Sequence, residues 1–347
     1  MKIAIMHGEV AKGAGPDEQD GLAEVAFVSD ALARLGHEPC VVSVSLNLEE
    51  SLQKLSNIRP SLVFNLVESL SGKGSLIHLA PALLDALGIP YTGVRTEAMF
   101  LTSNKLLAKR TLAGAGLPTP PWVSESEKPK MTTGQGTWIV KSLWEHASVG
   151  LDEESVFFAA DQTKIIEEMA ARGKTLGGSW FAERFIEGRE FNVSLIAGEN
   201  PTPKCKGEDS AGGAAPLPEQ GDPLVLPPAE IRFDGYPLGK VRVVGYRAKW
   251  EEKSFEYAET ARSFAFPQSD APLLARLKEL ALACWRLFEL RGYARVDFRV
   301  DAAGRPWILE VNANPCLSPD AGFLAAAAQF KMSHAEVLSR IINDATR

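Results

Sequence analysis

The sequence has few cysteines, no long apolar run and no excess of positive charge. Its four cysteines show no paired spacing typical of a metal or redox site, and a chain of 347 residues does not depend on disulfides. The longest apolar stretch, residues 323–328 with their flanks, is far shorter than the ~20 residues that a membrane-spanning helix needs. The first ten residues hold too short an apolar core for a signal peptide. We therefore expect a cytoplasmic protein with reduced thiols and no membrane partner.

The charge balance excludes another class of partner. Lysine and arginine number 37 against 44 aspartate and glutamate residues, which gives a net charge of −7. A surface of this sign does not neutralise a phosphodiester backbone, so we expect no nucleic-acid partner. Apolar residues make up 45% of the chain and charged residues 23%, a composition typical of a globular protein. At this length, two or three folding units are expected.

The first third of the chain alternates short β-prone runs with amphipathic helical segments. The strand candidates are residues 2–6, 41–45 and 61–67, and the helix candidates are residues 21–36, 48–57 and 75–87. Such alternation predicts a parallel, doubly wound α/β sheet. A further short strand in GIPYTG and a lysine-rich helix over residues 103–114 lead to the segment GAGLPTPP, which we interpret as a hinge.

Beyond the hinge, two β-prone segments, TWIVK and SWFAERFI, flank a helix near residues 162–171. This arrangement predicts a small α+β unit. A larger part follows, with a stretch over residues 200–228 that is rich in Pro, Gly and Ala and has no usable periodicity. Loops of that length are usually functional or mobile. The chain ends in a long helix, a hairpin and two more helices.

The hairpin RGYARVDFRVDAAGRPWILEVNANP carries the strongest chemical signal. With the turn at DAAG, Arg295 falls opposite Glu310, and strict alternation puts Asp297 and Asn312 on the same face. The other face of the second strand is expected to be core and consists of Trp307, Leu309 and Val311. Adjacent carboxylates repel each other unless a cation bridges them, and oxygen ligands of this kind suit Mg²⁺. The pattern therefore predicts a metal site, while a solvated face with a structural Asp/Arg pair stays equally open.

Three other motifs favour a site for nucleotide phosphates. Lys141 ends TWIVK and precedes SLWEHASVG, a loop of small and polar residues whose backbone amides can fold over phosphate oxygens. Lys105, at the start of a helix, supplies a second positive charge. In FAERFIEGREFNVS, Glu183 and Glu190 flank an apolar pair and a glycine, so that the backbone can meet an adenine edge while Glu190 accepts from ribose hydroxyls. Each motif alone also fits an ordinary solvated surface.

Taken in order, the motifs resemble those of the ATP-grasp superfamily and, within it, the D-alanine:D-alanine ligase family. The matching strings are VFNLVE, LGIPYTG, NKLLAKRTLAGAGLPTPPWV, IVKSLWEHASVG, AERFIEGREFNV, YRAKW, RVDFRV and ILEVNANP. The resemblance implies an α/β and α+β protein with a three-domain ATP-grasp architecture. Its units would be an N-terminal doubly wound α/β domain (1–102), a central lid (103–187) and a C-terminal catalytic domain (188–347), with ATP clamped between the last two.

The resemblance also assigns roles at matching positions. Those for the nucleotide are Lys105 and Lys141 on the ATP phosphates, Glu183, Phe185 and Ile186 at adenine, and Glu190 at ribose. Those for the metal, two Mg²⁺ ions or Mn²⁺ in their place, are Asp297, Glu310 and Asn312. Those for the reaction are Arg295 on the transferring phosphoryl group and the later oxyanion, Lys249 on a substrate carboxylate, and Ser148 as an orienting hydroxyl.

The implied activity is that of an ADP-forming carboxylate–amine ligase. A substrate carboxylate attacks the γ-phosphate, and an amine then displaces phosphate from the acyl phosphate. The substrates would be small amino acids or peptides, and a homodimer through the N-terminal domain is the oligomer that the family allows.

The departures from the family pattern fall on the amino-acid positions. Ala147 replaces one of two paired serines, and Trp250 replaces a tyrosine and offers only a donor N–H. Cys316 replaces a glycine in the acceptor pocket, and Ala321 or Gly322 replaces a serine that clamps the second carboxylate. We therefore expect substrates other than two D-alanines.

The N-terminal signature that offers a glutamate to the first amino group is replaced by HGEVAKGAGPDEQDG. Glu68, which ends VFNLVE, is a candidate to bind that amine, with a capping or surface role equally open. Two alternatives for the whole chain also stay open. One is the cell-wall D-alanine:D-alanine ligase working through compensating residues, and the other is a nucleotide-binding protein without catalysis.

Glu310→Gln tests the predicted metal face. The change removes one negative ligand from the metal clamp without altering side-chain volume, so we expect Mg²⁺-dependent turnover to be abolished and the fold to be retained. Steady-state kinetics with circular dichroism as the fold control measures both. Turnover within about tenfold of the wild type would remove Glu310 from the metal site.

Overall fold

A computed structural model describes residues 1–11, 13–125, 135–145, 147–198 and 222–347. Three sheets organise these residues, with three, four and six strands. Most of the long stretch predicted over residues 200–228 lies outside the described residues. Within the described part of the chain, no helix has both the length and the apolar character needed to cross a membrane.

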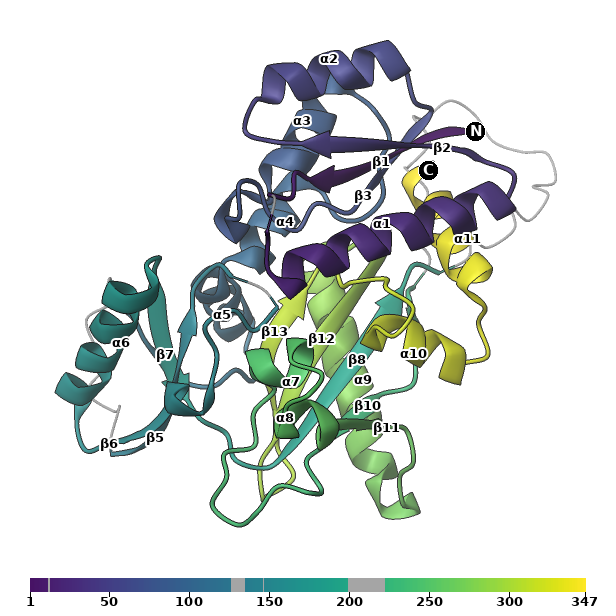
Figure 1. Ribbon diagram of the computed structural model, residues 1–347. Coiled ribbons are helices and arrows are strands. Elements are labelled where there is room, and N and C mark those ends of the chain that lie inside the picture. The colour runs from purple at the N-terminus through teal and green to yellow at the C-terminus, as the bar shows by residue number, and fades with distance from the viewer. Residues whose placement is uncertain (12, 126–134, 146, 199–221) are drawn as a thin grey trace, which may run out of the picture.

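The N-terminal sheet is parallel, in the order β2-β1-β3. Its strands are β1 (Lys2–Gly8), β2 (Glu38–Val44) and β3 (Leu62–Asn65). Helix α1 (Pro16–Arg34) covers one face, and α2 (Leu48–Ile58) and α3 (Leu79–Leu87) cover the other (Figure 1). Alternate side chains of β1 enter the two cores: Ile3 and Ile5 pack with α1, while Ala4 and Met6 pack with α2 and α3. The doubly wound arrangement is confirmed, although the strand expected in GIPYTG shortens to a single bridge between Val63 and Tyr91.

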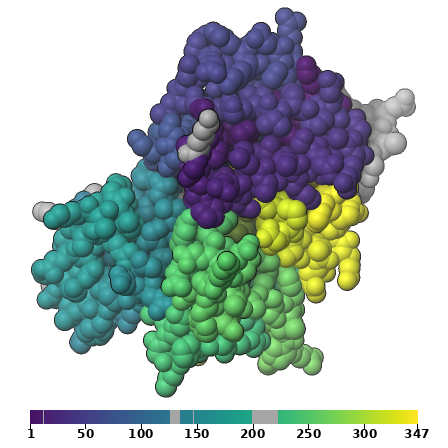
Figure 2. Space-filling view, in the orientation of Figure 1, coloured from purple at the N-terminus to yellow at the C-terminus, as the bar shows by residue number. Residues whose placement is uncertain are grey.

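Two helices connect this sheet to the middle unit, α4 (Thr96–Ser103) and α5 (Lys105–Gly114). The middle sheet is antiparallel in the order β4-β7-β5-β6, and α6 (Gln162–Leu176) lies against it. Its strands are β4 (Trp122–Val123), β5 (Gly136–Ser142), β6 (Val156–Ala159) and β7 (Trp180–Arg184). In the space-filling view this unit projects to one side of the molecule (Figure 2).

The C-terminal sheet is the largest and runs β11-β10-β8-β12-β13, with β9 also paired to β8. Its strands are β8 (Arg189–Ile196), β9 (Leu224–Val225), β10 (Ala229–Arg232), β11 (Ala261–Ser263), β12 (Tyr293–Val300) and β13 (Pro306–Asn312). Helix α9 (Ala271–Leu287) packs on one face of this sheet, in a core that also receives Ala108 and Leu112 of α5. Short helices α7 (Tyr246–Trp250) and α8 (Phe255–Ala258) lie in the connection between β10 and β11. Single 3₁₀ turns occur at Gly74–Leu76, Glu153–Ser155 and Gln268–Asp270.

The N-terminal and C-terminal units share one hydrophobic core. Helices α10 (Gly322–Gln329) and α11 (His334–Ala345) bring Phe323, Leu338 and Ile341 into the same cluster as Ile3 and Val28. Figure 1 shows α1 lying between the N-terminal sheet and α11. Because this core is continuous, the two units are held rigidly relative to each other.

The hairpin of β12 and β13 has a different register from the one expected. Arg295 pairs with Asn312 and Asp297 pairs with Glu310, so the expected pairing of Arg295 with Glu310 is wrong. The register shifts between Asp297 and Phe298, which is a β-bulge. As a result Ile308 is buried, whereas Leu309 lines a cavity, so the expected core face with Trp307 and Leu309 is wrong as well.

Candidate active site

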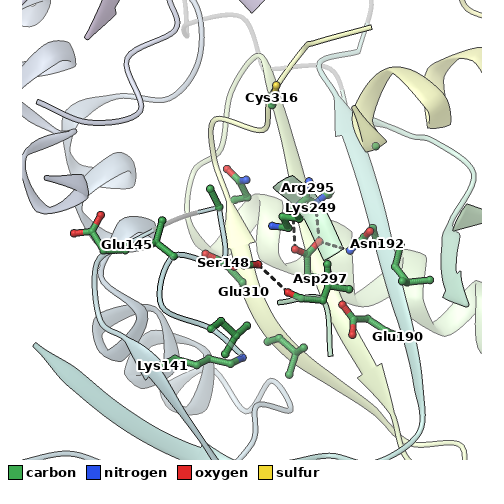
Figure 3. Close-up of a pocket in the computed structure, with 18 of the residues that line it drawn as sticks. Lys141, Glu145, Ser148, Glu190, Asn192, Lys249, Arg295, Asp297, Glu310 and Cys316 are labelled. Atoms are coloured by element: carbon green, nitrogen blue, oxygen red, sulfur yellow. Dashed lines mark hydrogen bonds and ion pairs between the residues drawn. The ribbon is translucent and has the colours of Figure 1, made fainter. Parts of the chain in front are cut away.

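A cavity of ≈ 580 Å³ lies where the three units meet. Asp20 and Glu68 line it from the N-terminal unit. Lys141 lines it from the middle unit, and Arg295 and Glu310 line it from the C-terminal sheet (Figure 3). All of the site residues predicted from the sequence line this one cavity. They are Lys105, Lys141, Ser148, Glu183, Phe185, Ile186, Glu190, Lys249, Arg295, Asp297, Glu310, Asn312, Glu68, Trp250 and Cys316. The structure brings the set together, and the roles assigned to its members stay predictions.

Asp297 is the centre of the polar face of the hairpin. It is paired in the sheet with Asn192 on β8 and with Glu310 on β13. Arg295 binds its carboxylate with two hydrogen bonds, Nε to Oδ1 at 2.7 Å and Nη2 to Oδ2 at 2.8 Å. The Asn192 amide donates to Oδ1 at 2.7 Å. Burial alone would lower the pKa of Arg295, but Asp297 and Glu310 hold it above its ordinary value, so the guanidinium stays charged.

Two lysines also face the hairpin. Lys105 Nζ lies 3.5 Å from Glu310 Oε1 and donates to the Glu145 carbonyl at 2.6 Å. Lys249 on α7 has its pKa lowered by burial and by the charge of Arg295, against an opposing effect of Glu310 and Asp297. The two carboxylates of the hairpin thus lie among three cations, which offsets their mutual repulsion.

A buried ion-pair triad joins α5 to the middle sheet. Lys109 Nζ lies 2.6 Å from Glu183 Oε2, and Lys141 Nζ lies 2.6 Å from Glu183 Oε1. Lys109 and Glu183 are each only 1% exposed, and Lys109 also donates to Thr119 Oγ1 at 2.7 Å. Burial alone would raise the pKa of Glu183, but the two lysines hold it below its ordinary value. Glu183 is therefore a fixed carboxylate that orients Lys141.

The loop after β5 is held against α7. Ala147 and Ser148 adopt left-handed backbone conformations, with φ of 57° and 61°. Ser148 Oγ donates to the Val244 carbonyl at 2.8 Å, and Trp250 Nε1 donates to the Ala147 carbonyl at 3.0 Å. Trp250 thus uses its single donor on the loop backbone, a contact that a tyrosine hydroxyl would make with different geometry.

An acidic wall faces Cys316 from helix α1. Asp20 accepts from Ser318 Oγ at 3.2 Å and from Cys316 Sγ at 3.4 Å, and Glu24 accepts from the Leu317 amide at 2.6 Å. Burial, then the neighbouring Glu68, raises the pKa of Glu24 well above its ordinary value. The pKa of the Cys316 thiol is also raised, first by burial and then by these carboxylates, so Cys316 stays protonated and does not act as a nucleophile.

Another contact joins α1 to α7. Tyr246 donates from its hydroxyl to Asp17 Oδ1 at 2.9 Å. Burial, together with this carboxylate, raises the pKa of Tyr246 to about 12. The pair ties the N-terminal unit to the segment that carries Lys249 and Trp250.

Among the residues that the sequence analysis missed are Asp17, Asp20, Lys109, Asn192 and Tyr246. Weak signals existed for three of them. Lys109 follows Lys105 by one helical turn, Asp20 precedes Glu24 by one turn, and Asn192 alternates with Glu190 along a strand. None of these spacings distinguishes a site residue from a surface residue without the tertiary contacts.

The oxygen donors of the hairpin fit a divalent cation. Among the described residues there is no group of three or more His, Cys, Asp or Glu side chains placed to hold a metal. The predicted set instead combines two carboxylates, Asp297 and Glu310, with the carboxamide of Asn312 on one cavity wall. Carboxylates completed by water and substrate phosphates are the usual ligands of Mg²⁺, so the residues present fit this ion.

Lys109→Met tests the buried triad. Removing the lysine leaves Glu183 buried with one partner, so we expect unfolding to become easier by about 3–5 kcal/mol. Urea denaturation measures the change. Adding Glu183→Gln to the same chain should recover part of the loss, because the uncompensated charge is gone. Lys164→Met, which breaks an exposed pair with Glu168, is the matched control and should leave stability unchanged. Equal effects of Lys109→Met and the control would contradict the assignment.

The chain is similar in sequence to known proteins. Residues 217–343 match the family model described as D-ala D-ala ligase C-terminus. The D-alanine–D-alanine ligase of Aquifex aeolicus is 27% identical over 99% of this chain and 100% of its own length. An uncharacterized protein of Sinorhizobium fredii is 25% identical over 91% of this chain and 85% of its own.

Solved structures show the same fold. The D-alanine–D-alanine ligase of Bacillus anthracis complexed with ATP superposes with a TM-score of 0.69 at 18% identity, over 100% of this chain and 98% of that one. The enzyme from Coxiella burnetii superposes with a TM-score of 0.66 at 15% identity, over 99% and 95% of the two chains. The chain therefore has the ATP-grasp fold and is a D-alanine–D-alanine ligase-like enzyme.

Proposed function

We propose that the chain is an ATP-dependent, ADP-forming ligase that joins two amino acids, with D-alanine as the reference substrate. The observation that carries this proposal is the polarity of the cavity. The carboxylates Asp20 and Glu68 line the same cavity as the cations Lys249 and Arg295, and Lys105 and Lys141, the lysines assigned to the phosphates, line it as well. A zwitterionic amino acid matches such a cavity, because its ammonium group can meet a carboxylate and its carboxylate can meet a cation.

Each part of the cavity has a distinct task in this proposal. Lys105 and Lys141 bind the ATP phosphates as point charges. Phe185 and Ile186 border the adenine, and Glu190, held by an ion pair of 2.8 Å with Arg299, accepts from the ribose hydroxyls. Asp297, Glu310 and Asn312 hold Mg²⁺, which when bound neutralises charge on the phosphate oxygens.

The reaction then needs positioning rather than a protein nucleophile. The donor amino acid is held by its ammonium group at the acidic wall, and its carboxylate oxygen attacks the γ-phosphorus as ADP leaves. Arg295, fixed by Asp297, stabilises the negative charge that develops on the phosphoryl group and later on the tetrahedral carbon. The acceptor amine attacks the acyl carbon, loses its proton, and phosphate departs. The proton-bearing thiol of Cys316 takes no part.

The departures at Ala321, Gly322 and Trp250 favour a second candidate, a ligase for a different acceptor. The relatives that span the chain carry the name of D-alanine–D-alanine ligase, which favours D-alanine instead. We therefore place D-alanine first and keep the different acceptor as the alternative outcome. An inactive nucleotide-binding protein is disfavoured, because the phosphate-side lysines and the oxygen donors all line one cavity.

Ligand-dependent melting and phosphate release test the proposal together. ATP with Mg²⁺ should raise the melting temperature without any amino acid, because ligand at 100 Kd stabilises the native state by about 2.7 kcal/mol. D-Alanine should then stimulate phosphate release and yield a dipeptide, measured against glycine and L-alanine. Lys141→Gln should weaken the ATP effect, whereas Lys164→Gln, on the surface of α6, should not.

Each result has a defined meaning. A shift with ATP and dipeptide formation from D-alanine support the proposal. A shift with ATP but turnover only with another amine supports the second candidate. No shift at millimolar ATP would contradict the nucleotide site itself.

A further inference from the structure

Arg262 lines the cavity but has no assigned task in the reaction. It lies on β11, at the edge of the C-terminal sheet, where it pairs with Ile231. Its Nη1 donates a long hydrogen bond of 3.4 Å to the Asp320 carbonyl. Within the described part of the chain, no ion pair engages its guanidinium. A guanidinium carries five N–H donors, so most of the hydrogen-bonding capacity of this exposed side chain, which lines the cavity, remains available to a ligand.

The position of Arg262 relative to Gly322 is the informative geometry. Its Nε and Nη2 lie 3.5 Å from the point where a side chain at residue 322 would begin. By the resemblance to the family pattern, a carboxylate-clamping serine would stand at residue 321 or at residue 322, which here are alanine and glycine. The guanidinium of Arg262 therefore lies next to one of the two positions at which this serine would stand. Because Gly322 has no side chain, the guanidinium of Arg262 has room at this position.

The charges around Arg262 distinguish it from Arg295. Arg295 is engaged by the Asp297 carboxylate with two hydrogen bonds. Arg262 faces the same cavity, and its pKa is lowered by burial and by the repulsion of Arg295, with only Asp320 opposing. An anion placed between the two guanidinium groups would relieve that repulsion. The acidic residues Asp20 and Glu68 line the same cavity and disfavour an anion on their own side.

We propose that Arg262 anchors the carboxylate of the acceptor amino acid and so replaces the missing serine clamp. This inference rests on the proposed function and deepens it: the acceptor is a free α-amino acid rather than an amine without a carboxylate. It also supplies the compensating residue through which D-alanine can serve as acceptor despite Ala321 and Gly322. The donor's carboxylate must be free to attack the γ-phosphate, so Arg262 binds only the carboxylate of the acceptor.

Competition between D-alanine and D-alaninamide measures this anchor directly. Both offer the same amine, but D-alaninamide has no free carboxylate and can act only as acceptor. In one reaction with ATP, Mg²⁺ and equal concentrations, mass spectrometry gives the ratio of dipeptide to dipeptide amide. The wild type should favour the dipeptide by about ten- to hundredfold, as expected for hydrogen bonds to a charged group.

Three variants make the result specific. Arg262→Gln should lower the ratio by about tenfold or more, with the ATP-induced melting shift unchanged, and Arg262→Lys should lie between, because a lysine is a point charge without the guanidinium fork. Arg276→Gln, which removes an exposed arginine paired with Glu279 on α9, should leave the ratio at the wild-type value. These outcomes support the anchor.

Other outcomes overturn it. A ratio unchanged by Arg262→Gln would show that the carboxylate is held elsewhere, while leaving the ligase proposal intact. If the wild-type enzyme makes the dipeptide amide as readily as the dipeptide, the acceptor carboxylate is not anchored, and the ligase proposal is again left intact. The absence of both products, with ATP still raising the melting temperature, would overturn the proposed reaction and the acceptor anchor with it.

Discussion

The pairing of β12 with β13 is the constraint on which the site depends. It sets Asp297 beside Glu310 on one face of the sheet, and two adjacent carboxylates repel unless positive charge compensates them. The fold supplies that charge from three directions: Arg295 on the same strand, Lys105 on α5 and Lys249 on α7. Ionic attraction, in addition to packing, therefore stabilises α5 and the connection that contains α7 against the hairpin.

The cavity is also lined by charges of both signs. Helix α1 contributes carboxylates that bind the C-terminal unit, as Glu24 binds the Leu317 amide. The hydrophobic core shared by α1, α10 and α11 holds the two units together. Of the two lysines assigned to the phosphates, Lys141 depends on Glu183, which also binds Lys109 in a buried triad. Under the proposed function, the carboxylates from the N-terminal unit would serve the amino acid and the lysines would serve the nucleotide, within a single cavity.

Local sequence patterns predicted most elements. All of the predicted site residues line the cavity, although several of them, such as Lys249 and Ser148, were assigned only through the family resemblance. The sequence patterns did not predict the β-bulge after Asp297, since one extra residue leaves no mark in the hydrophobic pattern, and this changed the partner of Arg295. Contacts between distant segments were also missed. Tyr246 with Asp17, and Arg262 over Gly322, depend on how the units meet, which no spacing in the sequence encodes.

The most direct test of the account follows the oxygen atoms of the donor carboxylate. With ATP, Mg²⁺ and D-alanine labelled with ¹⁸O in its carboxylate, the attacking oxygen passes to phosphorus and leaves with phosphate. The account predicts one ¹⁸O atom in each phosphate released, visible as an isotope shift in the ³¹P spectrum, and an equal amount of dipeptide. Phosphate that is released with dipeptide but carries no label would contradict carboxylate activation by ATP in this cavity.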